Sequence, residues 1–476
     1  MSSPEDTAGT STVRFGRLES RGVLLGLSTS QLALVGVALL VAVAAVFSAG
    51  AGGFAVTAPV WLTLLVAGTV SVAGRPVVGW VPLLAHWQAR RLTRATTAIS
   101  TTRGTRVARD VLVLPGLTGQ LELVPCDALG ATLILDRRAG VICGVLRVAG
   151  AGFVLDDPTG QEHKVAGWGR VLAGLCQQPA IVRVQLLART VPGGLAPARQ
   201  WWRDRCVSPT TELSIALAGL LDGGFVAPHA RDTLLAVALR APRGRPAPTA
   251  ADVAVVAKHL DAVATSLVGA DLTPQGWLGR EDLAAVVLSA YDPQAAARAE
   301  GGPGPIRAPM GVDEQWSFLR ADGAVHATYW VTEWPRSDVH PSFLQPLLLG
   351  EATPRTLTVI AEPLSIARAL REIRRSKAEH MADAAQRTRI GQVEAESTRA
   401  EVADLERREA ELVAGHGDLR FTGLVTVSAT SESELEERCA ALETAAAQAM
   451  CEVRRLFGQQ GQAHLAAALP LARGVL

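Results

Sequence analysis

The sequence predicts a two-helix transmembrane hairpin followed by a cytoplasmic α+β body, built of ferredoxin-like or split β-α-β layers and carrying a long charged helical arm. Residues 22–74 contain no charged side chain and no histidine. From residue 111 onward, strand-like and helix-like patterns alternate, which favours helices layered on a sheet. Residues 366–414 are dense in arginine and glutamate and sparse in large apolar side chains.

The uncharged run is expected to form the hairpin, behind a disordered N-terminal tail at 1–21. About 20 residues cross the hydrocarbon core of a bilayer, so the run is too long for one span. It divides into apolar segments at 31–48 and 56–73 around a glycine-rich turn. Arginines flank the two segments and are absent from the turn, so the positive-inside rule predicts a multi-pass plasma-membrane protein with both termini in the cytoplasm. A signal peptide fits poorly, because a second span follows the first and the body lacks disulfide spacing.

An amphipathic stretch, GWVPLLAHWQARRLTR at 79–94, completes the membrane region at 22–110. Tryptophans with basic neighbours suit a helix that lies at the level of the lipid headgroups. An ordinary juxtamembrane linker is the alternative. The stretch supplies five predicted membrane-interface residues: Trp80, Trp87, Arg90, Arg91 and Arg94.

Two α+β domains are predicted in the body, at 111–300 and 311–476. The first opens with alternating apolar and polar residues and glycine breaks, which indicate a small antiparallel meander. The boundary is placed in the Gly/Pro-rich segment between the two domains. Strands of the second domain are expected near 324–333, 356–361, 421–429 and 452–457, with helices near 342–349, 366–414 and 432–450.

The helical arm at 366–414 is the feature most suited to binding a partner. Its narrow apolar stripe is typical of a protruding arm or a coiled coil, while a solvated helix lying against the sheet is the alternative. A single helix there would be roughly 65 Å long, and Gly391 offers a point where it could instead divide into an antiparallel pair. The predicted partner-binding residues are Arg368, Arg371, Arg374, Arg375, Arg407 and Arg408.

The sequence predicts no catalytic, cofactor-binding or metal site, and hence no enzyme. None of the three lysines completes a Gly-Lys-Ser/Thr phosphate-binding loop, which excludes Walker-type ATP hydrolysis. Nucleophile-elbow and zinc-protease motifs are absent from the sequence, and the six cysteines lack metal-ligand spacing. The arginine cluster of the arm is diluted by glutamates and has no interleaved aromatic residue, so sequence-specific nucleic-acid binding is not expected.

Four segments, at 164–194, 290–296, 314–349 and 457–475, carry a resemblance to a protein family. The chain resembles actinobacterial membrane proteins associated with type IV secretion and conjugation. Its hairpin is similar to PrgI, a small membrane subunit of conjugation machines, and its body looks like the motor-free N-terminal half of the large type IV secretion ATPase. A motor domain is not expected, because only five residues follow Leu469-Pro470-Leu471.

This resemblance implies a non-enzymatic structural subunit of a type IV secretion or conjugation-like apparatus that docks a separately encoded secretion ATPase. It also implies a homo- or hetero-oligomeric assembly. An EccE-like component of a type VII secretion system is the alternative, since that subunit also pairs two N-terminal membrane helices with a cytoplasmic body. A membrane-bound enzyme of another type would need polar side chains that converge in a pocket.

Overall fold

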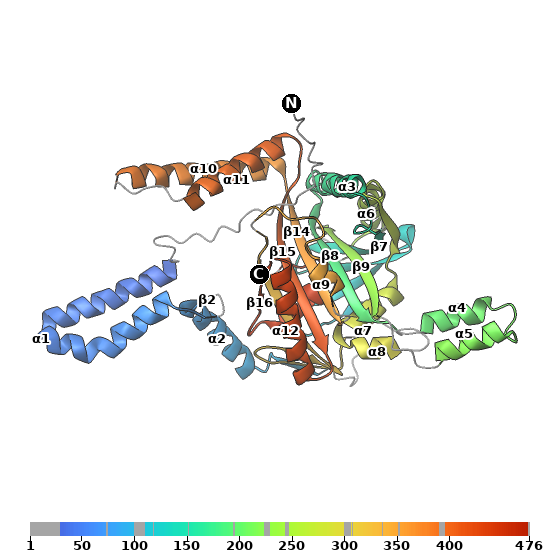
Figure 1. Cartoon of the computed structure of the whole chain (residues 1–476), viewed down its shortest axis with the longest axis horizontal. Coiled ribbons are helices and arrows are strands. Elements are labelled where there is room, and N and C mark those ends of the chain that lie inside the picture. Colours follow the sequence, from blue (N-terminus) through green and yellow to red (C-terminus); the bar gives the residue numbers. More distant parts are fainter. Residues whose placement is uncertain are drawn as a thin grey trace, which may run out of the picture. The chain divides into compact units, whose positions relative to one another are not determined.

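The computed structural model describes two compact units (Figure 1). The N-terminal unit ends at Thr96 and includes Phe457–Gln459, and the body holds the rest of the chain from Thr97 onward. The predicted tail at 1–21 lies outside the described residues. These are residues 29–72, 75–99, 110–117, 119–150, 152–193, 196–222, 229–242, 247–298, 306, 308–335, 337–350, 353–389 and 396–474.

One long apolar helical element, α1 (Thr29–Thr69), dominates the N-terminal unit. Between Ser30 and Thr69 it is long and apolar enough to cross a membrane, and few of its residues are buried. The backbone is non-helical at Ala49 and Gly50. The Gln31 side chain donates a 3.1 Å hydrogen bond to the carbonyl of Gly68, so the two ends of α1 contact each other. After α1 come β1 (Ser71–Val72), β2 (Arg75–Pro76) and α2 (Val77–Leu92).

The first half of the body contains two β-α-β units, and we name this half the first repeat. Its four main strands are ordered β10-β7-β9-β8, and all neighbours are antiparallel. In chain order this is 4-1-3-2, the arrangement of a ferredoxin-like split β-α-β fold. The repeat consists of β7 (Val141–Gly150), α3 (Pro158–Cys176), β8 (Ile181–Pro192), β9 (His229–Arg240), α6 (Ala250–Val268) and β10 (Leu272–Trp277).

The second half repeats this arrangement, with strands ordered β16-β13-β15-β14. In each repeat two helices are inserted between the second and third strands: α4 (Ala196–Arg205) and α5 (Glu212–Asp222) in the first, α10 (Ile366–Arg389) and α11 (Glu396–Val413) in the second. The second repeat consists of β13 (Ala324–Glu333), α9 (Gln345–Leu349), β14 (Arg355–Leu364), β15 (Asp418–Ala429), α12 (Glu432–Gln448) and β16 (Glu452–Arg455).

The two repeats share one sheet, because β14 pairs antiparallel with β8. An α+β body is therefore confirmed, and the segments on both sides of the predicted boundary at 300–311 belong to one compact unit. Smaller elements extend the sheet and cover it. They are β3 (Thr97–Ile99), β4 (Val111–Leu112), β5 (Leu121–Cys126), the 3₁₀ turn η1 (Asp127–Leu129), β6 (Ala131–Asp136), α7 (Arg280–Tyr291), α8 (Pro293–Arg298), β11 (Gly311–Glu314), β12 (Leu319–Ala321) and α13 (Gln460–Ala468).

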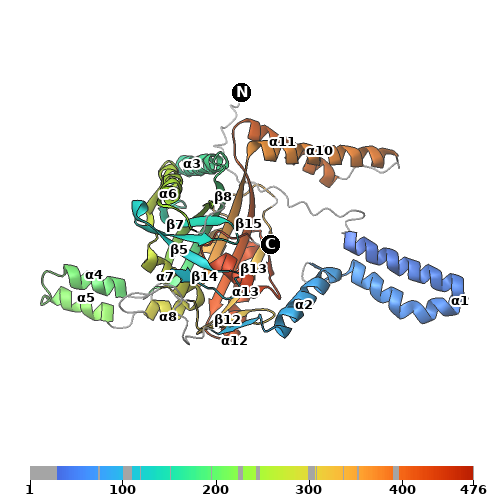
Figure 2. The same cartoon turned by 180° about the vertical axis from the view of Figure 1, so that it is seen from behind.

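Helices cover both faces of the shared sheet, which is why its strands are apolar on both sides. In β9, Leu235 and Val237 pack with residues of α3 and α6, whereas Leu234 and Ala236 pack with residues of α7 and the C-terminal segment. In the second repeat, α12 lies over the same face as α3 and α6, and α13 covers the opposite face. Figure 2 gives the view from behind.

The end of α13 and the C-terminal segment after it bind across the middle of the sheet. The buried Gln185 amide in β8 donates hydrogen bonds to the carbonyls of Ala466 (2.8 Å) and Leu469 (3.0 Å), and its oxygen accepts one from the Ala472 amide (2.6 Å). The Thr358 hydroxyl in β14 donates to the Ala467 carbonyl at 2.5 Å. Since β8 and β14 belong to different repeats, this segment ties the two repeats together.

Gly423 in β15 is expected to tolerate no side chain. A Cβ atom there would lie 2.6 Å from Cζ2 of Trp334 and 3.0 Å from Cγ2 of Val331. Gly423→Ala should therefore lower the free energy of unfolding by about 1–3 kcal/mol, as overpacking of a core does. Urea unfolding of the detergent-solubilised protein measures this loss. Gly311→Ala is the control, because no atom lies within 4 Å of its added Cβ, and equal stability of both variants would contradict the prediction.

Candidate partner-binding arm

The predicted arm is an antiparallel pair of helices, not one long helix. Lys377 of α10 forms an ion pair with Glu409 of α11, and His380 Nε2 lies 4.0 Å from a carboxylate oxygen of Glu401. As the residue number rises along α10, the partner's number falls along α11, which is the register of two antiparallel helices. Figure 1 shows the two helices side by side.

A small apolar cluster holds the base of the arm. Leu364 at the end of β14 packs with Ala369 and Ile373 on α10 and with Leu412 near the end of α11. The arm therefore starts where β14 ends and returns directly into β15. Because these two strands pair along their length, they bring the two ends of the arm together.

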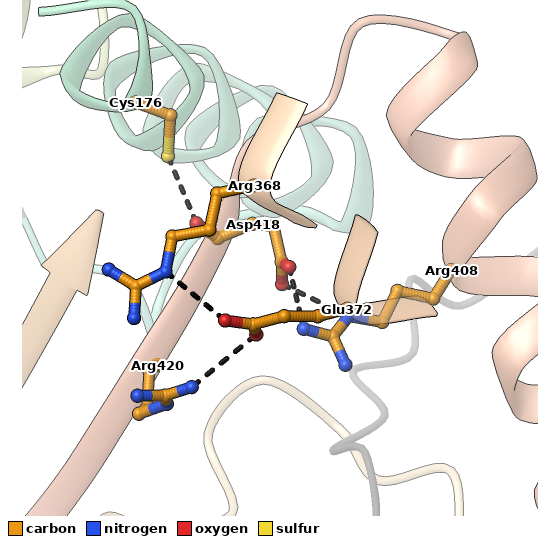
Figure 3. Close-up of polar contacts among 6 residues, drawn as sticks. All are labelled: Cys176, Arg368, Glu372, Arg408, Asp418 and Arg420. Atoms are coloured by element: carbon orange, nitrogen blue, oxygen red, sulfur yellow. Dashed lines mark hydrogen bonds and ion pairs between the residues drawn. The ribbon is translucent and has the colours of Figure 1, made fainter. Parts of the chain in front are cut away.

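A bidentate ion pair fixes α11 to the sheet (Figure 3). Arg408 donates through Nε (3.1 Å) and Nη2 (2.6 Å) to the two carboxylate oxygens of Asp418, the first residue of β15. The Asp418 carbonyl accepts a further contact from Cys176 Sγ of α3 at 3.3 Å. Planar two-point pairing is the strongest form of this interaction, and Asp418 is mostly buried, so Arg408 anchors the arm.

A second, more exposed ion-pair group lies beside this anchor. Glu372 of α10 accepts a 3.1 Å hydrogen bond from Arg368 Nε and lies 3.4 Å from Arg420 Nη2 of β15 (Figure 3). Exposed pairs of this kind contribute little to stability, typically about 0–1 kcal/mol. Arg368 therefore belongs to the base of the arm and is already committed to a neighbouring carboxylate.

The structure thus divides the six predicted arginines. Arg371, Arg374 and Arg375 lie exposed on α10, and we name these three the basic strip. Arg375 pairs along the helix with Glu379 at 3.0 Å yet stays 83% exposed. Arg407 is exposed on α11 and pairs with Asp404 at 2.7 Å.

The basic strip lies beside a helix-to-helix ion pair that orders the arm. Lys377 holds the pKa of the Glu409 carboxyl below its usual value, and Arg374 adds to the effect. Arg374 therefore lies close to the contact between α10 and α11, while its own side chain is exposed. The strip is thus positively charged surface on an ordered part of the arm, and it suits a partner with an acidic surface.

The predicted membrane-interface residues on α2 and just after it differ in exposure. Trp87 is only 9% exposed, and the Arg91 guanidinium lies 5.3 Å from its ring centroid. Trp80 and Arg90 are half-buried, and Arg91 and Arg94 are exposed. The large apolar side chains that α2 exposes are Val81, Leu84 and Leu92.

These three residues lie at helical spacing on one face, which the sequence reasoning missed. The exposed residues follow the pattern i, i+3, i+11, and Trp87 falls on another side of the helix. The signal was the periodicity of the aliphatic residues. The sequence prediction relied on the tryptophans instead, because aromatic residues are typical of the membrane interface.

Metal-ligand clusters, cavities and thiols are the features of the described residues that bear on a chemical site. No three histidine, cysteine or acidic side chains among them converge as metal ligands. A cavity of about 380 Å³ lies near Arg137, Gly140 and Arg240, and its other neighbours are mainly aliphatic and proline side chains. Burial raises the pKa of the Cys143 thiol to about 12, which disfavours the thiolate that a nucleophile requires.

Comparison with known proteins adds no relative to this description. No protein-family model matches the chain, and no curated protein sequence is significantly similar to it.

Proposed function

We propose that this chain is a non-enzymatic, membrane-anchored structural subunit of a type IV secretion or conjugation-like apparatus, and that its arm docks a separately encoded secretion ATPase. Two features together support the proposal. The chain has an apolar N-terminal element long enough to cross a membrane, and its α+β body carries a charged arm of two paired helices. The assignment to a type IV secretion or conjugation-like apparatus rests on the resemblance of the sequence to that family.

The anchor is a two-span hairpin in this proposal. The break at Ala49 and Gly50 divides α1 into two limbs of about 20 residues, each about 30 Å long, which is the thickness of the hydrocarbon core. The limbs meet closely at one end, because a Cβ on Gly68 would lie 2.9 Å from Val35 Cγ2. Small residues at such contacts are typical of helices that pack within membranes.

The orientation follows from the arginines around the hairpin. They occur before residue 22 and from Arg75 onward, and not in the 49–53 turn. The positive-inside rule then places both termini and the body in the cytoplasm. A body held at the bilayer meets its partner at raised effective concentration, which is what a docking platform requires.

The test combines membrane extraction with a pull-down. The tagged full-length chain should stay in native membranes after alkaline washing and, after gentle solubilisation, should recover a conjugation-type ATPase. A variant lacking residues 29–72 should be found in the soluble fraction. Recovery of an FtsK-like ATPase with type VII components would favour the EccE-like alternative. Release of the full-length chain by alkali, or recovery of no secretion component, would contradict the proposal.

A further inference from the structure

The helices α4 and α5 form a second helical pair, which we name the α4–α5 hairpin (196–222). It occupies the same position in the first repeat as the arm does in the second, between the second and third strands. Figures 1 and 2 both show α4 and α5 side by side, outside the layers of the sheet. At the open end of the hairpin, Arg199 Nε donates to the Leu221 carbonyl at 2.9 Å and lies 3.3 Å from an Asp222 carboxylate oxygen.

The α4–α5 hairpin exposes several large apolar side chains, although the buried residue of α5 is a serine. Ser214 is its buried residue on α5, and its hydroxyl shares a 2.7 Å hydrogen bond with Thr211 Oγ1 and lies 3.9 Å from Cys206 Sγ. By contrast, Val207 is 94% exposed and Leu213 is 80% exposed. Trp201, Ile215 and Leu220 are more than half exposed as well.

The apolar character of α5 extends around the whole helix. Between Glu212 and Asp222 it carries no charged residue, and Ser214 is its one hydroxyl side chain. A helix that is apolar on all sides is normally covered by a protein core or by lipid. In the described part of the chain α5 packs against α4, and Leu213, Ile215 and Leu220 of α5 remain exposed.

We propose that the α4–α5 hairpin lies in the interfacial layer of the lipid bilayer, with Val207, Leu213 and Leu220 in contact with acyl chains. This rests on the membrane anchorage proposed above, which keeps the body beside a bilayer. The 11 residues of α5 span about 16 Å, which is too short to cross the hydrocarbon core but enough to lie in the interface.

The polar side of the hairpin favours a lipid surface over a protein surface. The Arg205 guanidinium lies 5.6 Å from the ring centroid of Trp201, and Arg203 is exposed on the same helix. Tryptophan and arginine together are typical of helix ends at the headgroup level, where the ring meets both phases and the cation meets lipid phosphate. The exposed aliphatic residues Val207, Leu213 and Leu220 beside these groups complete a pattern suited to lipid.

The test places an environment-sensitive fluorophore on the full-length chain at Val207→Cys, in a Cys206→Ala background. The other five cysteines are buried, so labelling is selective. The chain is reconstituted in vesicles of phosphatidylcholine and anionic phosphatidylglycerol that contain acyl-brominated lipid. The matched control carries the label at Ala378→Cys, an exposed position on the arm.

We expect the label at position 207 to be quenched several-fold more than the control label, and Leu213→Gln with Leu220→Gln to remove most of that difference. Both leucines are exposed, so these changes leave the fold intact. Equal quenching at both positions would overturn the proposal. So would shielding of the label that depends on protein concentration or on an added protein extract, because a protein would then cover the hairpin. Alkaline extraction of the same vesicles reports the anchorage separately.

Discussion

Lowering the pH from 6.5 to 4 is expected to reduce the free energy of unfolding by about 3 kcal/mol through His326 alone. This histidine in β13 is fully buried. Its Nε2 donates to the carbonyl of Tyr291 (2.9 Å), and Nδ1 pairs with the Ser428 hydroxyl (2.8 Å). The ring of His464, also fully buried, has its centroid 4.5 Å from that of His326.

Burial lowers the pKa of His326 to about 4, and the Tyr291 carbonyl and Asp292 oppose the shift only in part. Burial and the neighbouring His326 lower the pKa of His464 well below its usual value. Between pH 4 and 6.5 the unfolded chain therefore binds protons that the native body does not, so stability falls as the pH falls. The contribution is fully present above about pH 6.5 and is lost as the pH approaches 4.

Urea unfolding of the detergent-solubilised chain at a series of pH values measures this effect. His326→Gln and His464→Leu should each make the acid-induced loss of stability smaller than in the unmodified chain. His416→Gln is the control, because His416 is exposed. An unchanged pH dependence in both core variants would show that neither histidine is kept neutral in the native state.

Local patterns in the sequence were enough to find individual elements of this fold. The strand predicted at 324–333 coincides with β13, and the helical segment predicted at 366–414 contains both α10 and α11. Alternation and helical periodicity are properties of neighbouring residues, so one sequence reveals them. Whether the segment at 366–414 was one helix or two depended on contacts such as Lys377–Glu409 and stayed open.

The duplication of the body was not predicted, because it depends on pairing between distant residues. The helical insertions α4–α5 and α10–α11 interrupt the two repeats at the same point with segments of different length and composition. The central role of Gln185 was hidden for the same reason, because its partners Ala466 and Leu469 lie more than 280 residues away. Nothing in the residues around Gln185 distinguishes it from a surface glutamine.

The roles of the arm arginines could not be predicted from the sequence for the same reason. Arg408 and Arg374 look alike in the sequence, since each lies in a run of charged residues. Only the close approach of α11 to the start of β15 gives Arg408 its partner Asp418. The structure therefore shows Arg408 in an ion pair that holds α11 to the sheet, and it leaves the basic strip exposed.

Reversing the charge of the basic strip is expected to lower recovery of the proposed partner ATPase at least about tenfold. The changes are Arg371→Glu, Arg374→Glu and Arg375→Glu. Placing like charges across an interface costs several kcal/mol, and each 1.4 kcal/mol corresponds to a tenfold loss of affinity. The readout is the amount of ATPase that co-purifies with equal amounts of tagged chain from native membranes.

A matched control reverses three exposed arginines of the body outside the arm, namely Arg138, Arg231 and Arg240, which changes the net charge by the same amount. If the strip contacts the ATPase directly, only the arm variant should lose it. Equal loss in both variants would show that total charge matters and would contradict the assignment of the strip.

Exchanging the Arg408–Asp418 ion pair tests whether Arg408 contacts the partner or only positions the arm. Arg408→Asp should weaken recovery of the ATPase because it breaks the pair with Asp418 and frees the base of α11 from the sheet. Adding Asp418→Arg should restore recovery, since the exchanged pair can form again. The same exchange should leave the effect of the basic-strip variant unchanged, because those three arginines are expected to act on the partner and not on the body. Failure of the exchanged pair to restore binding would place Arg408 in the contact surface itself.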